Sequence, residues 1–453
     1  MKVTLSKPIF SENGKGIMIT LILLYITYLY LFTTFSFPFI YEFLIIVNSS
    51  ICIWNIVNIR HEPYSLRMLV NFFIFVFFIL ANAIQFGNHN NVLTFQYSLT
   101  NNDFSFFQFI IFFILVIFNG LYDIFKSIEY KSIVLPKINY KKSVYLSLIV
   151  TFLILLYFRF NPYALLLRGF VADMLSASRD SEAVGAGPIK LIFDHFIRPI
   201  PWAIFLVNII VKGNSKKNNT ILFLCALITV FPTGLARNAA AMFWIPVFII
   251  YFRKFIKGRN FIWVMFAGIF IAFPLLDNFR NFDGTVRHNA GLDYLNNMNF
   301  DASQIFMTVL DTGLTTFGKQ LAGVFLFFVP RSIWATKPIG SGAFLVDNMG
   351  GWFSNVSMPY FAEGYINFGY FGILLFIIIL AYGSKKLDSC YWLSKNHGSL
   401  FQGYYLILLG AIMFIMRGDM MSSFAYTLGL LVCYFVVTKL IIIKPKKKSF
   451  MYA

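Results

Sequence analysis

The chain has 453 residues, of which 58% are hydrophobic and only 12% are charged, against about 25% charged residues in an average soluble protein. A soluble fold could not bury that much apolar surface, so the composition excludes a soluble globular protein. The net charge of +18 is spread in short runs of Lys and Arg between apolar segments, whereas nucleic-acid binding needs these residues gathered on one solvated face. We therefore expect an integral membrane protein with no nucleic-acid partner.

Apolar runs long enough to cross a membrane recur along the whole chain. A helix needs about 20 apolar residues to cross roughly 30 Å of hydrocarbon at ~1.5 Å per residue. We therefore predict an all-α polytopic fold with about twelve transmembrane helices in a single membrane domain over residues 1–453. The runs lie near 16–36, 38–57, 69–87, 104–124, 144–158, 194–211, 219–235, 238–252, 260–276, 365–383, 399–416 and 421–440.

Alternate loops between these runs hold most of the 37 lysines and arginines. Cytoplasmic loops carry the excess of positive charge, which places both termini inside. Two long segments, 159–193 and 277–364, then face outside. The second lies between spans 9 and 10 and is too long for a simple connector, so we expect it to contain short or re-entrant helices. Within it, Leu321 to Val329 is too short to cross, and we expect this stretch to dip into the outer membrane interface.

The basic residues on the predicted outer side are mostly arginines. Positive charge is disfavoured there, so they indicate a partner such as phosphate or carboxylate, which suits a planar, permanently charged and bidentate donor. Acidic residues share that side, and the alternative is that some arginines only pair with these. The acidic residues are Asp173, Asp180, Glu182, Asp194, Asp277, Asp283, Asp293, Asp301, Asp311, Asp347, Glu363 and Asp419. Arg237 lies at the start of a helix in the small-residue turn Thr233-Gly-Leu-Ala-Arg237-Asn, where backbone amides add a positive dipole. We interpret it as a diphosphate clamp, with an interfacial anchor as the alternative.

A second basic turn runs from Phe328 to Gly342. Its two prolines and two late glycines favour a rigid, non-helical path that would hold Arg331 and Lys337 in place. Trp334 lies between the two cations, so we predict a site for an anion or a sugar. The alternative is the ordinary enrichment of Trp and Arg at a membrane interface.

Glu363 lies where the long outer segment enters the next span, in the run Tyr360-Phe-Ala-Glu363-Gly. A carboxylate there is costly unless it is paired or used. We predict either a general base for a sugar hydroxyl or an ion pair with an arginine. Arg417, in the sequence Arg417-Gly-Asp419, is the candidate partner.

His288, which follows Arg287 in the large outer segment, is a second candidate base. A solvated loop histidine is the alternative interpretation. No spacing of His, Cys and carboxylate residues predicts a metal site, and no Gly-rich loop predicts a nucleotide site. We therefore expect no metal and no other cofactor.

Together, these motifs resemble the O-antigen (Wzy-type) oligosaccharide repeat-unit polymerases, which are related to the O-antigen ligases. The resemblance rests on the order and outer placement of four stretches: 233–238, 328–338, 363–372 and 417–419. It implies a GT-C-like fold in the cell inner membrane with an active periplasmic face. There, a growing glycan on undecaprenyl diphosphate is transferred to a lipid-linked repeat unit without a metal or a nucleotide sugar.

The resemblance also implies roles for individual residues. Glu363 would orient or deprotonate the acceptor hydroxyl, while Arg237 and Arg331 would hold the donor diphosphate and offset its departing negative charge in place of a metal. The implied diphosphate ligands are Arg237, Arg331, Lys337, Arg287, Arg280 and Arg417, and the implied glycan contacts are Trp334, Asp419 and Tyr360.

Two alternatives stay open beside the polymerase. Related ligases have a His-Asn pair before a Gly-x-x-Gly step, where this chain has Ser357-Met358, which favours a polymerase and leaves the identity of the base open. A lipid-linked oligosaccharide flippase or transporter should show two similar halves with short outer loops, and this sequence shows no repeat. Whether a chain-length regulator or a flippase binds the chain also stays open.

Overall fold

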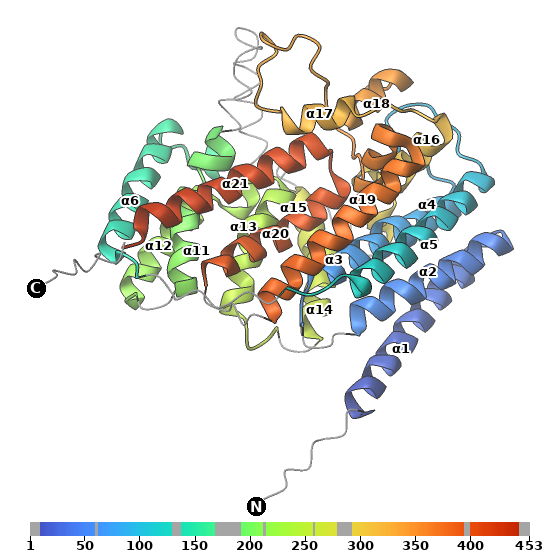
Figure 1. The fold of residues 1–453 in the computed structure, drawn as a ribbon, viewed down its shortest axis with the longest axis horizontal. Helices are drawn as coiled ribbons and strands as arrows, with labels where there is room; N and C mark the ends of the chain where they lie inside the picture. Colours follow the sequence, from blue (N-terminus) through green and yellow to red (C-terminus); the bar gives the residue numbers. More distant parts are fainter. Residues whose placement is uncertain are drawn as a thin grey trace, which may run out of the picture.

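The computed structural model describes residues 10–58, 62–128, 137–167, 192–211, 214–256, 259–278, 292–393 and 399–443. All named secondary structure in these ranges is helical. The helices form one bundle, with the N-terminal helix α1 (Phe10–Thr34) at its edge (Figure 1). The predicted all-α fold is confirmed.

Nine helical stretches of the described residues are long and apolar enough to cross a membrane. Several are built from consecutive α and π segments without a break in the helical path. The nine are α2 (Phe39–Val57), α3 (Leu66–Phe73) with η1 (Ile74–Leu80) and α4 (Ala81–Gly87), α5 (Asn101–Ile124), α6 (Tyr140–Tyr157), η2 (Phe193–Ile197) leading into α11 (Ile200–Val211), α14 (Asn260–Ala267) with η4 (Gly268–Ala272) and α15 (Phe273–Asn278), α19 (Tyr360–Trp392), α20 (Leu400–Arg417) and α21 (Met420–Ile441). The prediction of a polytopic membrane protein is therefore confirmed.

Every predicted apolar run overlaps a helix. The three runs that are not among the nine long stretches correspond to α1, α12 (Lys216–Thr229) and α13 (Arg237–Tyr251). The run predicted at 219–235 ends early because a 3₁₀ turn, η3 (Pro232–Gly234), starts at a proline, which cannot continue a helix. The total of about twelve spans stays a prediction.

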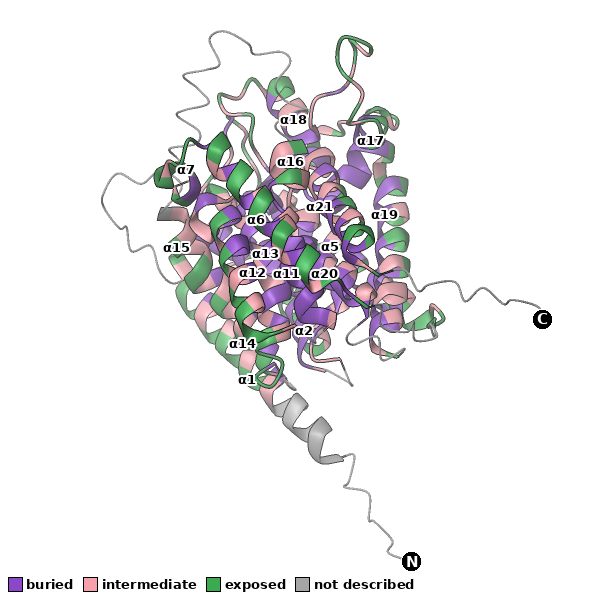
Figure 2. Cartoon of the chain, turned by 90° about the vertical axis from the view of Figure 1, so that its left-hand side faces the viewer, coloured by how far each residue is buried: buried purple, intermediate pink, exposed green. Residues whose placement is uncertain are grey.

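The core consists of two clusters of buried side chains, each built around one central helical stretch. The stretch Leu66–Gly87 is buried except at Arg67 and Gly87, which are partly exposed, and it packs against α2, α5, α20 and α16 (Ala302–Thr312). Helix α11 is the centre of a second cluster that includes α12, α6 and α21, while α13 packs against α20 between the two. Figure 2 shows buried residues in the interior and exposed residues on the outer faces of peripheral helices such as α6 and α14. Apolar side chains on those outer faces are typical of helices that face lipid.

Helix α19 is folded back on itself, which corrects the continuous run predicted over 365–383. Its backbone breaks at Phe368 (φ −146°, ψ 23°) and Gly369 (φ 63°, ψ −149°). Across the break, the Tyr360 hydroxyl donates to the carbonyl oxygen of Phe376 at 3.2 Å, although these positions would lie about 24 Å apart on a straight helix. Residues 360–367 therefore form a short helix that packs against the long helix formed by 370–392.

The large segment predicted to face outside contains several short helices. They are η5 (Leu292–Leu295), η6 (Met298–Phe300), α16, α17 (Lys319–Phe325) and α18 (Ser341–Met349). Figure 1 shows α16, α17 and α18 together at the end of the bundle that lies far from the N-terminus. The buried Gln85 ties this end to the core, because its amide donates to the carbonyl oxygens of Leu295 and Phe300, both at 3.0 Å.

Candidate functional site

Glu363 lies on the folded-back helix and is fully buried. Its Oε2 accepts a hydrogen bond from Ser341 Oγ at 2.8 Å, and its Oε1 accepts one from the backbone N–H of Met420 at 2.9 Å. Ser341 begins α18 and Met420 begins α21, so the carboxylate faces the N-termini of two helices. Their partial positive charges favour an anion. The ion pair predicted between Glu363 and Arg417 is absent, and these helix ends take the place of the arginine.

Asp419 lies between the same two helices. As the N-cap of α21 it accepts a hydrogen bond from the N–H of Ser422 at 3.1 Å, and its other oxygen accepts from the N–H of Gly342 at 3.3 Å. Gly340 approaches so closely that an added Cβ would lie 2.5 Å from Asp419 Oδ2. Gly340, one of the late glycines of the second predicted turn, is therefore needed to bring the start of α18 against this carboxylate.

Arg417 pairs with Asp301. Its Nη2 lies 3.0 Å from Asp301 Oδ1, and the side chain of Asp301 is only 5% exposed. The other oxygen of Asp301 accepts a hydrogen bond from the N–H of Ser357 at 3.0 Å. Arg417 Nε and Ser357 Oγ are both buried without a hydrogen-bond partner. This part of the site therefore has hydrogen-bonding capacity left for a ligand.

Arg237 begins α13 and is held by four groups. Its Nη1 lies 3.2 Å from Asp277 Oδ1 and donates to the Tyr294 hydroxyl at 3.1 Å, while Nη2 donates to Asn299 Oδ1 at 2.6 Å. The guanidinium lies over the ring of Phe273, with the carbon 4.0 Å from the ring centre. Burial raises the pKa of Tyr294 to about 12, so this hydroxyl is neutral at physiological pH. Arg237 is thus fixed in one orientation with its side chain 11% exposed.

The small residues before Arg237 have a packing role. An added Cβ on Gly234 would lie 1.9 Å from the carbonyl oxygen of Leu165, and the Thr233 hydroxyl donates to the carbonyl of Leu166 at 2.5 Å. Both carbonyls belong to the short helix α7 (Pro162–Leu166). The turn that presents Arg237 is therefore fixed by direct contact with α7.

The short segment 299–301 contacts both Arg237 and Arg417. Asn299 accepts a hydrogen bond from Arg237, and Asp301 pairs with Arg417. Residues two apart in a chain lie at most about 7 Å apart, so both guanidinium groups reach the same segment. Residues from distant parts of the sequence therefore converge at one end of the bundle.

Arg331 and Lys337 are not part of this convergence. Arg331 Nη1 donates to the carbonyl of Lys337 at 2.7 Å, and Lys337 Nζ donates to the carbonyls of Phe327 at 2.5 Å and Val329 at 3.0 Å. Burial, together with the nearby charge of Arg331, lowers the pKa of Lys337. Trp334 lies in the same loop and is partly exposed. Both cations brace their own loop, and their binding of a diphosphate stays a prediction.

The other predicted site residues fall into two groups. The hydroxyl of Tyr360 is bound to the backbone of Phe376, so contact with a glycan would require this hydrogen bond to break. His288, Arg287 and Arg280 lie outside the described residues.

The sequence interpretation missed three residues that the structure places in the site: Ser341, Tyr294 and Asn299. The concentration of Asn and Asp between 293 and 301 was the only signal for the last two. The alternative that some outer arginines pair with outer acidic residues is confirmed for Arg237, which pairs with Asp277, and for Arg417, which pairs with Asp301.

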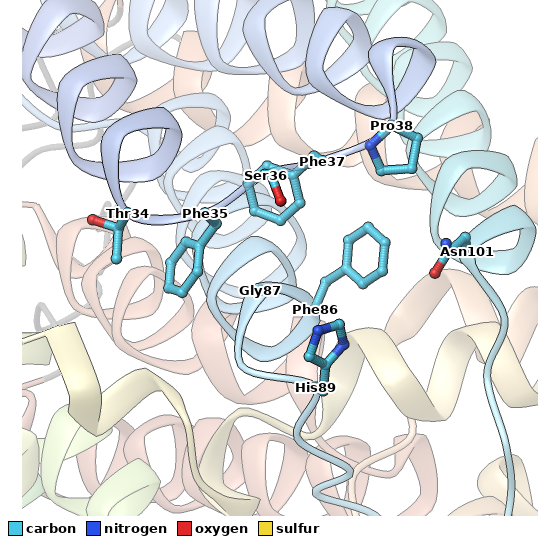
Figure 3. A pocket seen from close by; sticks show the side chains of 9 residues that line it. All are labelled: Thr34, Phe35, Ser36, Phe37, Pro38, Phe86, Gly87, His89 and Asn101. Atoms are coloured by element: carbon cyan, nitrogen blue, oxygen red, sulfur yellow. The ribbon is translucent and has the colours of Figure 1, made fainter.

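A pocket of about 230 Å³ lies elsewhere, where α1 joins α2. It is lined by Thr34 to Pro38 together with Phe86, Gly87, His89 and Asn101 (Figure 3). The ring of Phe86 lies between Phe37 and Asn101 in this view. The lining contains no lysine or arginine, so the pocket lacks the cations that a diphosphate site needs, and His89 is its one imidazole.

Within the described ranges, no three His, Cys, Asp or Glu side chains come together as a metal site requires. Independence from metal stays a prediction. Comparisons with protein-family models, with curated proteins and with solved structures found no match to this chain. The case for a function therefore rests on the chemistry of the converging residues.

Proposed function

We propose that the chain polymerises undecaprenyl-diphosphate-linked oligosaccharide repeat units at the periplasmic face of the cell inner membrane. In this proposal the chain has about twelve spans in a GT-C-like arrangement, with both termini in the cytoplasm. The observation that carries the proposal is the convergence of Arg237, Arg417, Glu363 and Asp419, which come from three separate motifs, at one end of a membrane-embedded bundle.

The reaction assigned to this site is a glycosyl transfer. The hydroxyl oxygen of the acceptor sugar attacks the anomeric carbon of the donor glycan, and the bond from that carbon to the diphosphate oxygen breaks. The electron pair leaves with undecaprenyl diphosphate, and the hydroxyl proton passes to a carboxylate. Arg237 and Arg417 offset the charge that develops on the leaving diphosphate, and such stabilisation is large in a site that excludes water.

Glu363 is the carboxylate best placed to accept that proton. Both of its oxygens already accept hydrogen bonds, so one of these must be exchanged for the acceptor hydroxyl. The bond from Ser341 is the one that can be released, because a hydroxyl rotates freely whereas the backbone N–H of Met420 is fixed. Asp419 then stays in place as the cap that holds α21 beside the reacting groups.

The proposal is tested by the length of the surface polysaccharide on a gel, in a deletion strain complemented with variants at matched membrane levels. Arg237→Lys keeps the charge but loses the forked geometry, so we expect the ladder of polymer lengths to disappear while single repeat units still reach the surface. Arg67→Lys is the matched control. Arg67 also pairs with an aspartate, Asp123, at 2.8 Å, but this pair lies at the C-terminal end of α5 and contains none of the candidate site residues. We expect this control to give a normal ladder.

Other outcomes would overturn parts of the proposal. A normal ladder from Arg237→Lys would remove this arginine from the reaction. If deletion of the chain stopped every repeat unit from reaching the surface, an O-antigen ligase or a flippase would be the better assignment.

A further inference from the structure

The loop between α17 and α18, residues 326–338, carries large apolar side chains that contact little else. Ile333 is 79% exposed and Phe328 is 64% exposed. The loop projects beyond the helices in both views (Figures 1 and 2). Because Arg331 and Lys337 hold its two sides together, we call it the braced loop.

The bracing pairs some of the loop's backbone carbonyl groups from within the loop. Carbonyl oxygens of Phe327, Val329 and Lys337 accept hydrogen bonds from the two cationic side chains. Backbone polar groups that enter an apolar environment must be paired inside the protein. The braced loop meets this requirement at its base without help from a neighbouring element.

The base of the loop lies at the level where α21 begins. The rings of Phe325 and Phe327 pack against Phe424, with ring centres 5.8 Å and 6.3 Å away. Phe424 comes one helical turn after Met420, or about 6 Å along the axis, and α21 is one of the helices able to cross a membrane. The exposed part of the braced loop, which includes Phe328 and Ile333, therefore starts at the level where the membrane-spanning helix α21 begins.

The loop and the residues that flank it in sequence carry only positive charge. Residues 312–346 contain Lys319, Arg331 and Lys337 but no Asp or Glu, and the structure gives Arg331 and Lys337 no carboxylate partner within the described residues. Apolar side chains next to basic residues match the interface of a bilayer, where acyl chains meet anionic headgroups.

We propose that the braced loop is a membrane anchor that inserts Phe328 and Ile333 between the headgroups of the outer leaflet, where Arg331 and Lys337 bind phospholipid phosphates. This inference goes beyond the proposed function and holds whatever reaction the chain performs. The loop leads directly to Gly340 and Ser341, which contact Asp419 and Glu363. Anchoring it would therefore fix the start of α18 in the site.

The test places an environment-sensitive NBD dye on the full-length protein through Ile333→Cys, with Cys390→Ser removing the one native cysteine that is not buried. The protein is reconstituted in vesicles of phosphatidylcholine and phosphatidylglycerol that contain no lipid-linked sugar. The matched control is Asp347→Cys, an exposed position on α18 at the same end. We expect lipids with a shallow doxyl group to quench the dye at 333 several-fold more than at 347, and iodide to show the reverse order.

Three results would overturn the inference. Equal quenching at 333 and 347 by iodide would show that the loop stays in water. Protection of the dye at 333 from both quenchers would indicate a protein contact instead of lipid. Lipid quenching that appears only after a lipid-linked diphosphate sugar is added would assign the loop to substrate, whereas unchanged lipid quenching after that addition would support bulk phospholipid.

Discussion

The backbones of Gly364 and Gly372 are in direct contact. A Cβ added to Gly372 would lie 1.8 Å from the carbonyl oxygen of Gly364, and one added to Gly364 would lie 2.7 Å from the carbonyl oxygen of Gly372. This contact closes the fold in α19 and sets the position of Glu363, which is adjacent to Gly364 in sequence. The location of the buried carboxylate thus depends on two positions where only glycine fits.

Gly372→Ala should therefore destabilise the protein strongly. Overpacking of a core typically costs about 1–3 kcal/mol and sometimes more, and here the obstacle is backbone that cannot rotate away. Gly383→Ala is the control, because it lies on the same helix with no atom within 4 Å of an added Cβ. We expect a lower thermal unfolding midpoint in detergent for the first variant only. Equal midpoints would contradict the folded-back arrangement.

Glu363→Gln should separate chemistry from folding. The amide can still accept a hydrogen bond from Met420 and can donate to Ser341, so we expect little change in the unfolding midpoint. An amide cannot take a proton at physiological pH, so polymer should be lost. Ser341→Ala keeps the carboxylate and removes one hydrogen bond, at a cost of about 1 kcal/mol, and should retain polymer. A normal ladder from Glu363→Gln would remove the base role.

The pair formed by Asp301 and Arg417 should behave as a coupled unit. Arg417→Ala leaves Asp301 buried and unpaired, which should cost about 2 kcal/mol or more, less than a fully buried pair because Arg417 is 27% exposed. Adding Asp301→Asn removes the buried, unpaired negative charge and should restore part of the stability. Polymer should stay absent in the double variant, since the guanidinium is missing. Additive losses of stability would show that the two residues do not interact.

Asp388 should be essential for stability and irrelevant to chemistry. It is fully buried and accepts hydrogen bonds from the N–H of Leu66 at 2.9 Å and from the hydroxyls of Tyr122 at 2.8 Å and Tyr405 at 2.7 Å. Asp388→Ala would leave these donors unsatisfied, at about 3 kcal/mol or more in total. The exposed Asp347→Ala should have no effect. If both variants unfolded at the same temperature as the parent, the Asp388 cluster would not stabilise the fold.

The sequence predicted the membrane helices well because the length and apolarity of a run are local properties. All predicted runs overlap helices, including the one in the centre that is buried along almost its whole length. The fold in α19 escaped prediction because it depends on contact between Gly364 and Gly372, which is visible only once the chain has turned.

The candidate site was predicted in part. Arg237, Glu363 and Arg417 stand out as single charged residues in apolar surroundings, which a sequence displays directly, and their chemical roles stay predictions. The partners of these residues cannot be read from the sequence, because residues far apart in the chain become neighbours only in the folded structure. Arg417 meets Asp301 instead of Glu363, and two helix N-termini satisfy Glu363.

The most direct test of the central claim uses the purified chain in vesicles with an undecaprenyl-diphosphate-linked repeat unit, a chelator and no nucleotide sugar. We predict that glycans of increasing length appear together with free undecaprenyl diphosphate, and that Arg237→Lys abolishes both while Arg67→Lys does not. Movement of the lipid-linked sugar across the bilayer without any increase in glycan length would contradict the assignment as a polymerase and identify the chain as a transporter.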